Sequence, residues 1–390
     1  MQVLFCHDGP LRVDDNGSYY GISHNDEMFK RYFSIANKIA TVIRVRGISP
    51  EESTKSLSEI NISPFKVYEI PNIKSVKGIF KRKKAKKIIE NAVLESDYIV
   101  ARMPSTAASI AIDFAKKHHK PYITEVVACP WDSLWNHSLK GKVLAPYSYY
   151  STRKKVKESK YVVYVTNKFL QRRYPTKGES LNCSDVTLTE FDESILQRRL
   201  KKIKEKKEDE KIIIGTTAAV NVRYKGQQYI IKALGELKKQ GQTNYEYQLV
   251  GSGDQSYLRS IAKKYNVVDQ VKFLGPLPHN KIFDWLESID IYTQPSRQEG
   301  LPRALIESFS RGLPAFGART GGIPELLEDD FIFSNTRKNI DEICNILMNF
   351  DIETMKEQSI RNFEEAKKYD KKIIDHRREK FFKKFKDFSD

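Results

Sequence analysis

Short strand-sized runs of β-branched and aromatic residues alternate with helix-sized stretches along most of this chain. In the first half the expected strands are residues 3–6, 40–44, 66–70, 98–101, 122–127 and 161–165, and expected helices include residues 25–37, 81–94 and 106–118. The alternation begins again at Lys211 and continues to about residue 330. This pattern is typical of parallel sheets with helices on their faces, so it predicts an α/β fold.

The chain is too long for one ordinary hydrophobic core. Its 390 residues predict about two domains. We expect one domain over residues 1–190 and a second over residues 206–365, with the boundary near residues 190–210. The Lys-, Arg- and Glu-rich stretch 192–210 predicts a solvated helix or linker. The tail 370–390 carries apolar side chains on one helical face, which predicts either a terminal helix that packs back on a domain or a helix on a membrane surface.

Composition narrows the class of protein. No apolar run approaches the ~20 residues of a membrane span, and the first residues show no signal-peptide pattern, so we expect a cytoplasmic protein. The four cysteines are scattered without metal-ligand spacing, as in reduced structural thiols. The net charge of +17 calls for an anionic partner, and charge alone leaves nucleic acid, anionic lipid and phosphorylated substrates open.

The stretch from residue 294 to residue 325 carries the strongest chemical signal. It predicts the end of a strand, a glycine turn, a helix and a second short strand, with Glu299 in the turn and Glu307 inside the helix. We expect Pro302 at the first helical position, where its missing N–H costs nothing. A helix start offers free amides to a phosphate, whereas the two carboxylates suit ligand hydroxyls. Together they predict a phosphate-bearing polyol such as a nucleotide sugar.

A basic turn follows the first strand of the second domain. Arg223 and Lys225 lie in the segment 221–226 and could neutralise a diphosphate leaving group. The alternative is an exposed turn with ordinary surface charges. The functional interpretation is favoured because the turn and the glutamate motif belong to the same edge of the expected sheet.

Two further turns could line a nucleotide. Gly251 and Gly253 follow a strand, but Ser256 stands where a dinucleotide fingerprint needs its third glycine, so dinucleotide binding is disfavoured. Gly275 and Leu277 lie in a Gly-Pro-Leu-Pro turn that could wall a base pocket or be a plain tight turn.

Metal and nucleophile motifs are missing from the sequence. There is no Asp-x-Asp pair, no His-Glu-x-x-His, no Gly-x-Ser-x-Gly and no metal pattern among the seven histidines. We therefore expect no metal cofactor, and chemistry performed by positioned carboxylates, cations and backbone dipoles.

The sequence leaves two interpretations open for the basic run 81–87 and two for the cluster 131–137. The basic run 81–87 is either a solvated helix face or a surface attracted to anionic lipid, and nucleic acid is disfavoured because no recognition module accompanies it. The aromatic and polar cluster 131–137 either lines a sugar site or packs as a structural cluster.

Together these motifs resemble glycosyltransferase family 4. The resemblance rests on the spacing of the two glutamates, Arg-Tyr-Lys-Gly at 223–226, Val-Gly-Ser-Gly at 250–253, Phe-Leu-Gly at 273–275 and Gly-Gly-Ile-Pro-Glu at 321–325. It implies a GT-B architecture, in which two Rossmann-like domains face a cleft, and a retaining, metal-independent transfer from a nucleotide-activated sugar. It also implies that the final helix crosses back to the first domain.

The same resemblance assigns roles to residues. It implies that Glu299 contacts the donor sugar and Glu307 the ribose. The amides of Gly300 and Leu301 would face the diphosphate or sugar, and Lys225 would bind the diphosphate. Gly251, Gly253, Gly275 and Leu277 would line the nucleotide.

The chain departs from the family in two places. The usual Gly-Arg pair is Ala219-Val220 here, so the arginine role is lost or passes to Arg223. A familiar first-domain histidine has no clear match, with His137 as the candidate.

We therefore expect a sugar transferase of bacterial surface polysaccharide (capsule) biosynthesis. Its partners would be a nucleotide-sugar donor and a glycan or polyprenyl-linked acceptor, and it would contact the anionic inner face of the cell membrane peripherally. The alternatives are a nucleotide-sugar epimerase of the same architecture, or a non-enzymatic basic module that binds lipid or nucleic acid.

Overall fold

The computed structural model describes residues 1–390 apart from residues 49–56, 74–80, 190, 208 and 390. Its internal contacts divide the chain into two compact units. Unit 1 contains Met1–Trp131, Val143–Cys183 and Asp375–Asp390, and unit 2 contains Asp132–Lys142 and Ser184–Ile374. We expected the boundary within 190–210, and the division falls between Cys183 and Ser184.

Unit 1 is built on a sheet whose central strands are parallel. Their order is β5-β3-β1-β6-β7-β8-β9, with β2 antiparallel to β1 and β4 antiparallel to β2. The strands are β1 Gln2–Val13, β2 Tyr19–Gly21, β3 Lys38–Gly47, β4 Ser58–Glu59, β5 Phe65–Glu69, β6 Tyr98–Met103, β7 Tyr122–Val126, β8 Tyr161–Tyr164 and β9 Glu179–Asn182. All six strands expected in the first half are present.

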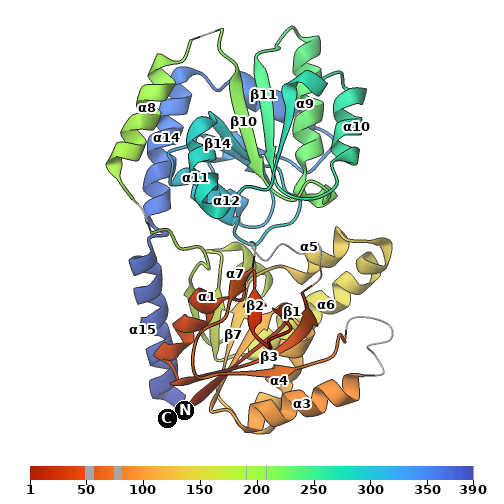
Figure 1. Ribbon diagram of the computed structural model, residues 1–390, viewed down its shortest axis with the longest axis vertical. Coiled ribbons are helices and arrows are strands. Elements are labelled where there is room, and N and C mark those ends of the chain that lie inside the picture. The colour runs from red at the N-terminus through yellow and green to blue at the C-terminus, as the bar shows by residue number, and fades with distance from the viewer. Residues whose placement is uncertain (49–56, 74–80, 190, 208, 390) are drawn as a thin grey trace. The chain divides into compact units, whose positions relative to one another are not determined.

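Helices connect these strands (Figure 1). They are α1 Asp26–Lys30 with a 3-10 turn Arg31–Ser34, α3 Arg82–Leu94, α4 Thr106–Lys117, α5 Pro130–Trp135, α6 Leu139–Glu158, α7 Phe169–Arg173 and the terminal α15 Lys371–Ser389. The expected helix 25–37 is shorter than its pattern, because the 3-10 turn ends it at Ser34.

The first strand runs further than its sequence indicated. We expected β1 to end at the His-Asp-Gly-Pro segment, but it continues to Val13 after an irregularity in pairing between Cys6 and Pro10. The reason is Asp8, whose carboxylate accepts hydrogen bonds from the amides of Thr106 (2.7 Å) and Ala107 (2.8 Å) at the start of α4. Those amides would otherwise lack acceptors, so the bulge caps a helix and does not end the strand.

Helices α3 and α4 cover one face of the unit 1 sheet, and α15 packs on other residues of the unit. One face buries small and aliphatic side chains of α3 and α4, among them Ile89, Ala108 and Ile112. Aromatic rings of α15 lie against other residues of unit 1: Phe382 lies 6.0 Å from Tyr32, and Phe385 lies 5.6 Å from Tyr98 (centroid distances). These two phenylalanine rings are buried and therefore not available to a lipid surface.

Unit 2 has a six-stranded parallel sheet in the order β12-β11-β10-β13-β14-β15. Its strands are β10 Ile212–Thr217, β11 Tyr245–Val250, β12 Val271–Gly275, β13 Ile291–Gln294, β14 Ala315–Ala318 and β15 Ile332–Phe333. Counted along the unit this is the order 3-2-1-4-5-6 of a Rossmann fold, whose ligands bind beyond the carboxyl ends of the strands.

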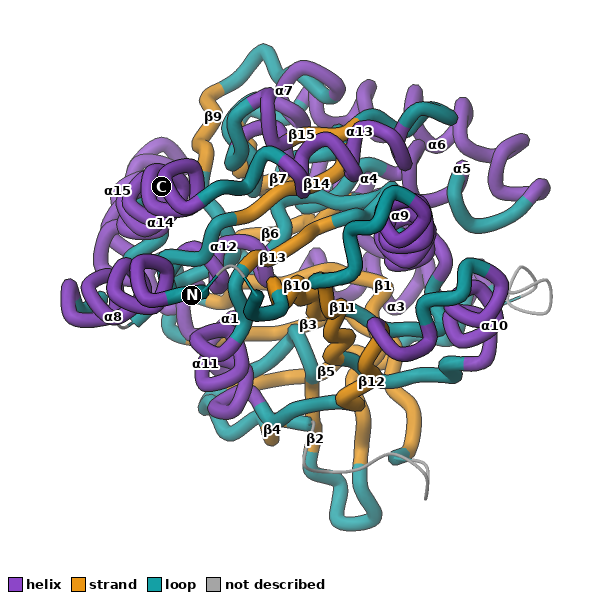
Figure 2. Tube along the Cα trace, turned by 90° about the horizontal axis from the view of Figure 1, so that it is seen from above, coloured by secondary structure: helices purple, strands orange, loops and turns teal. Residues whose placement is uncertain are grey.

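The helices of unit 2 lie on both faces of that sheet. They are α8 Glu193–Glu205, α9 Gln227–Lys239, α10 Ser256–Lys264, α11 His279–Ser288, α12 Arg303–Phe309, α13 Asn339–Met348 and α14 Ile352–Lys367, with short 3-10 turns, including η3 Arg223–Lys225. One core packs α9, α10 and α13 on the sheet, and a second packs α11 and α12. Figure 2 shows α9 and α10 beside β10, β11 and β12.

Helix α8 is part of the unit 2 core, which corrects our expectation of a solvated helix or linker. Ile195 and Leu196 pack against Phe363 of α14, and Figure 1 shows the two helices side by side. Arg199 is buried and donates to the carbonyls of Ile289 (2.6 Å) and Leu286 (2.8 Å). The sequence did not indicate that α8 packs in the core, because the charged residues on its outer face outnumber the apolar residues on its buried face.

Buried thiols occur in both units. Cys6, Cys129 and Cys183 lie in unit 1 and Cys344 in unit 2, and all four are buried. No helix among the described residues has the length and apolar character needed to cross a membrane.

Candidate functional site

The basic turn and the glutamate motif meet at the carboxyl edge of the unit 2 sheet. Lys225 of η3 and Glu299, in the loop after β13, form an ion pair of 2.8 Å between Nζ and Oε1. Their side chains are 25% and 13% exposed, so the pair is sheltered yet reachable. A second tie joins the two loops, because the amide of Arg297 donates to the carbonyl of Tyr224 (2.7 Å). The structure thus brings together two side chains that are 74 positions apart.

Buried polar residues of β13 hold Glu299 in place. Gln294 Nε2 donates to Glu299 Oε1 (3.1 Å), and the Tyr292 hydroxyl donates to Gln294 Oε1 (3.2 Å). The amide of Thr217, at the end of β10, donates in turn to the Tyr292 hydroxyl (3.3 Å). A carboxylate fixed by a strand side chain keeps its orientation with little loss of side-chain freedom on binding.

Glycines allow the loops around this pair to pack at backbone contact. Gly226, between η3 and α9, has φ of 81°, and a Cβ there would lie 1.8 Å from the carbonyl oxygen of Pro295. Gly321 has φ of 57°, and its Cβ would lie 2.2 Å from the carbonyl oxygen of Glu299. Both positions need the left-handed conformation and the missing side chain at once. The turn at Gly321 and Gly322 therefore packs directly against the backbone of the Glu299 loop, and the Gly322 amide donates to the carbonyl of Gly300 (2.7 Å).

Glu307 lies on α12, one turn beyond the start of the helix, and is 7% exposed. Burial raises the pKa of Tyr292, and the negative charges of Glu307 and Glu299 add to the rise. Pro302 is the residue before the helix, with ψ of 110°, and Arg303 is the first helical residue. Our placement of Pro302 inside the helix was therefore wrong by one position, because its extended ψ puts it outside the first turn.

Gly251 and Gly275 tie two neighbouring strand ends together. The Gly251 amide donates to the Gly275 carbonyl (2.9 Å), and a Cβ on Gly251 would lie 2.0 Å from the carbonyl oxygen of Ala218. Gly253 has φ of 118° and packs on Asn221, while Leu277 packs on the second core of the unit. These glycines thus form the edge of the sheet next to the basic turn.

Arg223 and Lys225 belong to one turn but diverge. The Arg223 guanidinium lies over the ring of Tyr257 on α10, 4.4 Å from its centroid, and the residue is exposed. Val220, at the position of the family's arginine, is buried in the first core of unit 2. Arg223 is therefore an exposed cation of the same turn whose guanidinium contacts Tyr257 while Lys225 pairs with Glu299, and Val220 is a packing residue.

The aromatic cluster 131–137 is divided between the units. Trp131 packs edge-on against Tyr149 of α6 in unit 1, with ring centroids 5.9 Å apart. Asn136 donates to the carbonyl of Arg297 (3.1 Å) within unit 2. His137 lies in the same segment as Asn136 and is exposed.

Sequence reasoning missed Gln294 and Tyr292, which orient Glu299. The available signal was polar side chains in a strand that is otherwise a core strand, since all four residues of β13 are buried. No three His, Cys, Asp or Glu side chains in the described part of the chain gather closely enough to hold a metal ion.

Comparison with known proteins gives the family. Residues 197–362 match the family described as Glycosyl transferases group 1. Protein CapJ of Staphylococcus aureus is 33% identical over 339 residues, covering 85% of this chain and 82% of CapJ. The amylovoran biosynthesis glycosyltransferase AmsK of Erwinia amylovora is 36% identical over 111 residues, covering 27% of each chain. The structure of Anabaena HepE in complex with UDP-glucose has a TM-score of 0.64 at 16% identity and covers 98% of this chain and 100% of its own.

These matches differ in what they show. HepE, at 16% identity, confirms the GT-B fold class that the motifs implied. CapJ is similar over most of both chains, and the group 1 match covers most of unit 2, including the Lys225–Glu299 pair. The chain therefore belongs to the group 1 glycosyltransferases, and it is an enzyme that transfers glycosyl groups.

Proposed function

We propose that this enzyme transfers a sugar from a nucleotide-sugar donor, with retention of configuration at the reacting carbon and without a metal ion. The observation that carries the proposal is the Lys225–Glu299 ion pair at the carboxyl edge of a Rossmann-type sheet, with the buried Glu307 on α12, the helix that follows the Glu299 loop. A cation, a sheltered carboxylate and a buried carboxylate match the three parts of such a donor, namely its diphosphate, its sugar and its ribose. HepE was solved with UDP-glucose, which is a donor of this class.

In this proposal the donor diphosphate displaces Glu299 from Lys225. Lys225 then neutralises the phosphates, with Arg223 and the amides of Gly300 and Leu301 as further donors of positive charge. Glu299 is freed to accept hydrogen bonds from the sugar hydroxyls, while Glu307 accepts from the ribose. The turns at Gly251, Gly253, Gly275 and Leu277 would line the nucleotide.

The transfer step needs no metal if protein groups stabilise the leaving group. As the bond between the anomeric carbon and the phosphate oxygen breaks, the growing negative charge on the diphosphate is held by Lys225 and Arg223. The leaving phosphate takes the proton of the acceptor hydroxyl on the same face of the sugar, and the new glycosidic bond forms there. Configuration is therefore retained.

For the acceptor we propose a glycan or a polyprenyl-linked sugar of bacterial surface polysaccharide synthesis. AmsK carries the description of amylovoran biosynthesis glycosyltransferase, which favours this class. The net charge of +17 favours an enzyme that works against an anionic membrane, on its cytoplasmic face.

The test is a panel of nucleotide sugars screened by thermal shift, followed by transfer with the donor that binds. A ligand present at about 100 times its Kd stabilises the folded state by ~2.7 kcal/mol, so one donor should raise the melting temperature by several degrees. Glu307→Ala should lose this shift and all transfer. The product anomer, read by NMR, should match the donor anomer.

Two outcomes would contradict the proposal. An inverted product anomer would exclude the retaining mechanism. Loss of turnover in a chelator, restored by an added divalent ion, would exclude metal-independent transfer.

A further inference from the structure

One helix of unit 1 leaves a row of apolar side chains uncovered. Val143, Leu144, Tyr147 and Tyr150 of α6 are 79%, 54%, 76% and 68% exposed. We call these four residues the α6 stripe. Single exposed apolar residues are ordinary, but a contiguous group marks an interaction surface.

The opposite face of the same helix holds it to unit 1. Ala145, Thr152 and Val156 are buried, and the ring of Tyr149 packs on Tyr174 with centroids 5.3 Å apart. These contacts fix the helix without any help from the stripe. The fold therefore gives no reason for large apolar side chains on its outer face.

The stripe continues into a cluster of cations along the helix. From Val143 the outward positions recur at steps of four, three, four and three residues, through Tyr147 and Tyr150 to Lys154 and Lys157. This row spans about 21 Å along the helix axis. Its first half is apolar and aromatic, and its second half is basic.

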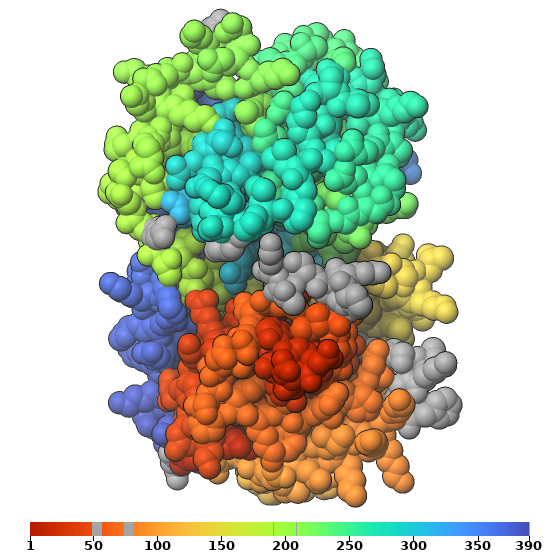
Figure 3. Space-filling view, in the orientation of Figure 1, coloured from red at the N-terminus to blue at the C-terminus, as the bar shows by residue number. Residues whose placement is uncertain are grey.

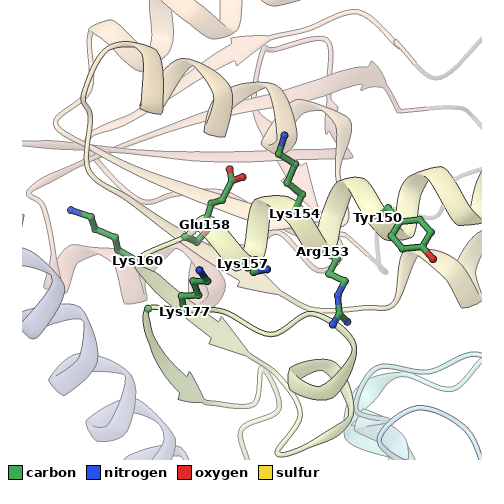
Figure 4. Close-up of a pocket in the computed structure, with 9 residues that line it drawn as sticks. Tyr150, Arg153, Lys154, Lys157, Glu158, Lys160 and Lys177 are labelled. Atoms are coloured by element: carbon green, nitrogen blue, oxygen red, sulfur yellow. The ribbon is translucent and has the colours of Figure 1, made fainter.

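The basic half lines a concavity of about 690 Å³ (Figure 4). Its cations are Arg153, Lys154, Lys157, Lys160 and Lys177, and we call them the basic pocket. Figure 4 shows the first three on α6 and the last two on the neighbouring segments. The one carboxylate of the lining, Glu158, forms an ion pair with Lys116.

The cations of the basic pocket are poorly compensated. Lys154, Lys157 and Lys177 form no ion pair with the described carboxylates. Glu158 lies one helical turn from Lys154, but its pKa is lowered mainly by its hydrogen bond from Lys116 and less by the charge of Lys154. Arg153 is held in position, because it donates to the carbonyl of Arg173 (2.5 Å) and to the Tyr149 hydroxyl (3.1 Å). A concavity with this excess of positive charge suits phosphate groups.

We propose that the outer face of α6 docks unit 1 on an anionic lipid surface, with the α6 stripe in the interface and the basic pocket on the lipid phosphates. Aliphatic side chains, tyrosines and lysines on one helix face suit a helix that lies along a membrane surface, where the aliphatic side chains reach the acyl boundary and the tyrosines and lysines meet the headgroups. The α6 stripe alone would also suit a protein partner, but the positive charge of the basic pocket complements the phosphates of an anionic lipid surface and therefore favours lipid. Aliphatic Val143 and Leu144 have no stacking role on nucleic acid, which disfavours that alternative.

This inference deepens the proposed function and rests on its placement of the acceptor at an anionic membrane. It also places the membrane contact on α6, whereas the sequence suggested the basic run 81–87. The basic run 81–87 lies on α3, where Lys83, Lys84, Lys86 and Lys87 are exposed but the apolar residues Ala85 and Ile89 are buried in the core. Figure 3 shows the α3 region (orange) and part of the α5–α6 region (yellow) at the surface. Within residues 82–87, which the structure describes, the α3 run presents charge but no exposed apolar side chain, whereas the outer face of α6 presents both.

The test compares three variants of the full chain in a vesicle co-sedimentation assay. The stripe variant carries Val143→Ser, Tyr147→Ser and Tyr150→Ser. The pocket variant carries Lys154→Ala, Lys157→Ala and Lys177→Ala. The control variant carries Lys83→Ala, Lys86→Ala and Lys87→Ala, which removes the same charge from α3.

Vesicles of phosphatidylcholine with about 30 mol% phosphatidylglycerol should bind the wild type, and pure phosphatidylcholine should bind it much less. The pocket variant should lose about 100-fold in partition at low salt, at about fivefold per lysine, and the control variant should lose clearly less. The stripe variant should lose the binding that persists at about 0.5 M salt, where charge is screened.

Several results would overturn the docking surface. They are equal losses in the pocket and control variants, a stripe variant that binds like wild type, and full competition by a single-stranded oligonucleotide at equal phosphate concentration. Dimers that disappear in the stripe variant would assign the face to a second copy of the chain. A conservative Tyr147→Trp variant, whose emission should shift to the blue on anionic vesicles, gives a reading that does not depend on the triple variants folding.

Failure here is separable from failure of the proposed function. Donor binding by thermal shift involves unit 2, so all three variants should retain it. A wild type that binds a nucleotide sugar but no anionic vesicle would overturn the docking surface and leave the donor chemistry standing.

Discussion

Lys225→Ala tests whether the cation at the unit 2 site binds the donor or only holds Glu299. The substitution removes one partner of a 2.8 Å ion pair, and Glu299 keeps the hydrogen bond from Gln294 (3.1 Å). Because the pair is partly exposed, its contribution to folding should be on the order of 1 kcal/mol, which lowers the melting temperature by about 2–4 °C. The variant should therefore stay folded.

Transfer should suffer much more than stability. Removing one group that stabilises developing charge typically costs about 10²- to 10³-fold in rate, or ~2.7–4 kcal/mol. We expect kcat/KM to fall by that factor and the affinity for the free nucleoside diphosphate to fall as well. The matched control is Lys239→Ala at the far end of α9, which breaks a 2.9 Å surface ion pair with Glu236 and should leave transfer unchanged.

The assay is release of the nucleoside diphosphate, with binding of that product measured by calorimetry. Glu299→Gln completes a double-mutant cycle. If Lys225 binds the diphosphate, Lys225→Ala should weaken product binding in both the wild-type and the Glu299→Gln background. If Lys225→Ala left kcat/KM within about threefold, or had no further effect once Glu299 was changed, the diphosphate role would be refuted.

Three further predictions concern the fold. Asp290 is buried and pairs with the partly buried Lys206 (2.9 Å) and Lys202 (3.1 Å). Asp290→Ala removes this acceptor and should cost ~1.5–3 kcal/mol in unfolding free energy, because both lysines keep backbone carbonyl acceptors. Burial raises the pKa of Asp290, but its lysine and amide partners lower it overall, so the deficit relative to wild type should shrink as the pH falls below about 4 in denaturant titrations. Gly226→Ala should destabilise by more than ~2 kcal/mol and impair transfer, whereas Gly241→Ala, with the same φ of 81° but nothing near its Cβ, should cost only ~1 kcal/mol by thermal melting. Phe385→Ala should cost about 3–5 kcal/mol and Phe388→Ala less than 1 kcal/mol, because their exposed fractions are 1% and 61%; equal losses in chemical unfolding would contradict the packing of α15.

The strands and the site loops were predictable from sequence because their signals are local. Runs of β-branched or aromatic residues mark most of the parallel strands, but not β9, whose sequence is Glu-Ser-Leu-Asn and which was not predicted. Glu299 and Lys225 each follow a strand of the same sheet. The parallel topology then brings their loops to one edge. The partners of Glu299 could not be found in the same way, because Gln294 and Tyr292 lie in a strand that pattern analysis assigns to the core.

Helix α6 was missed and helix α8 was misjudged, for different physical reasons. Helix α6 contains Pro146 and carries apolar residues on its exposed face as well as its buried face, so it lacks the one-sided periodicity that marks a helix. Helix α8 has a one-sided pattern, but its many charges favoured a solvated helix or linker over a helix packed in the core. The end of β1 was misjudged because Asp8 acts on Thr106, which is 98 positions away. Hydrophobic periodicity detects an element that is buried on one side only. It does not detect a helix with apolar residues on its exposed face, such as α6, or a hydrogen bond between residues far apart in the sequence, such as that between Asp8 and Thr106.

Because each unit contains a buried cysteine, the rate at which that thiol is alkylated reports how often the core of that unit transiently opens. Cys6 lies in the centre of the unit 1 sheet, and Cys344 lies on α13 of unit 2. Burial raises the pKa of both thiols, that of Cys344 to about 11, so neither reacts with an alkylating reagent near neutral pH while its core is closed. Pulsed alkylation read by mass spectrometry therefore measures, in one native sample, how often each core exposes its interior and whether a bound donor slows Cys344 alone.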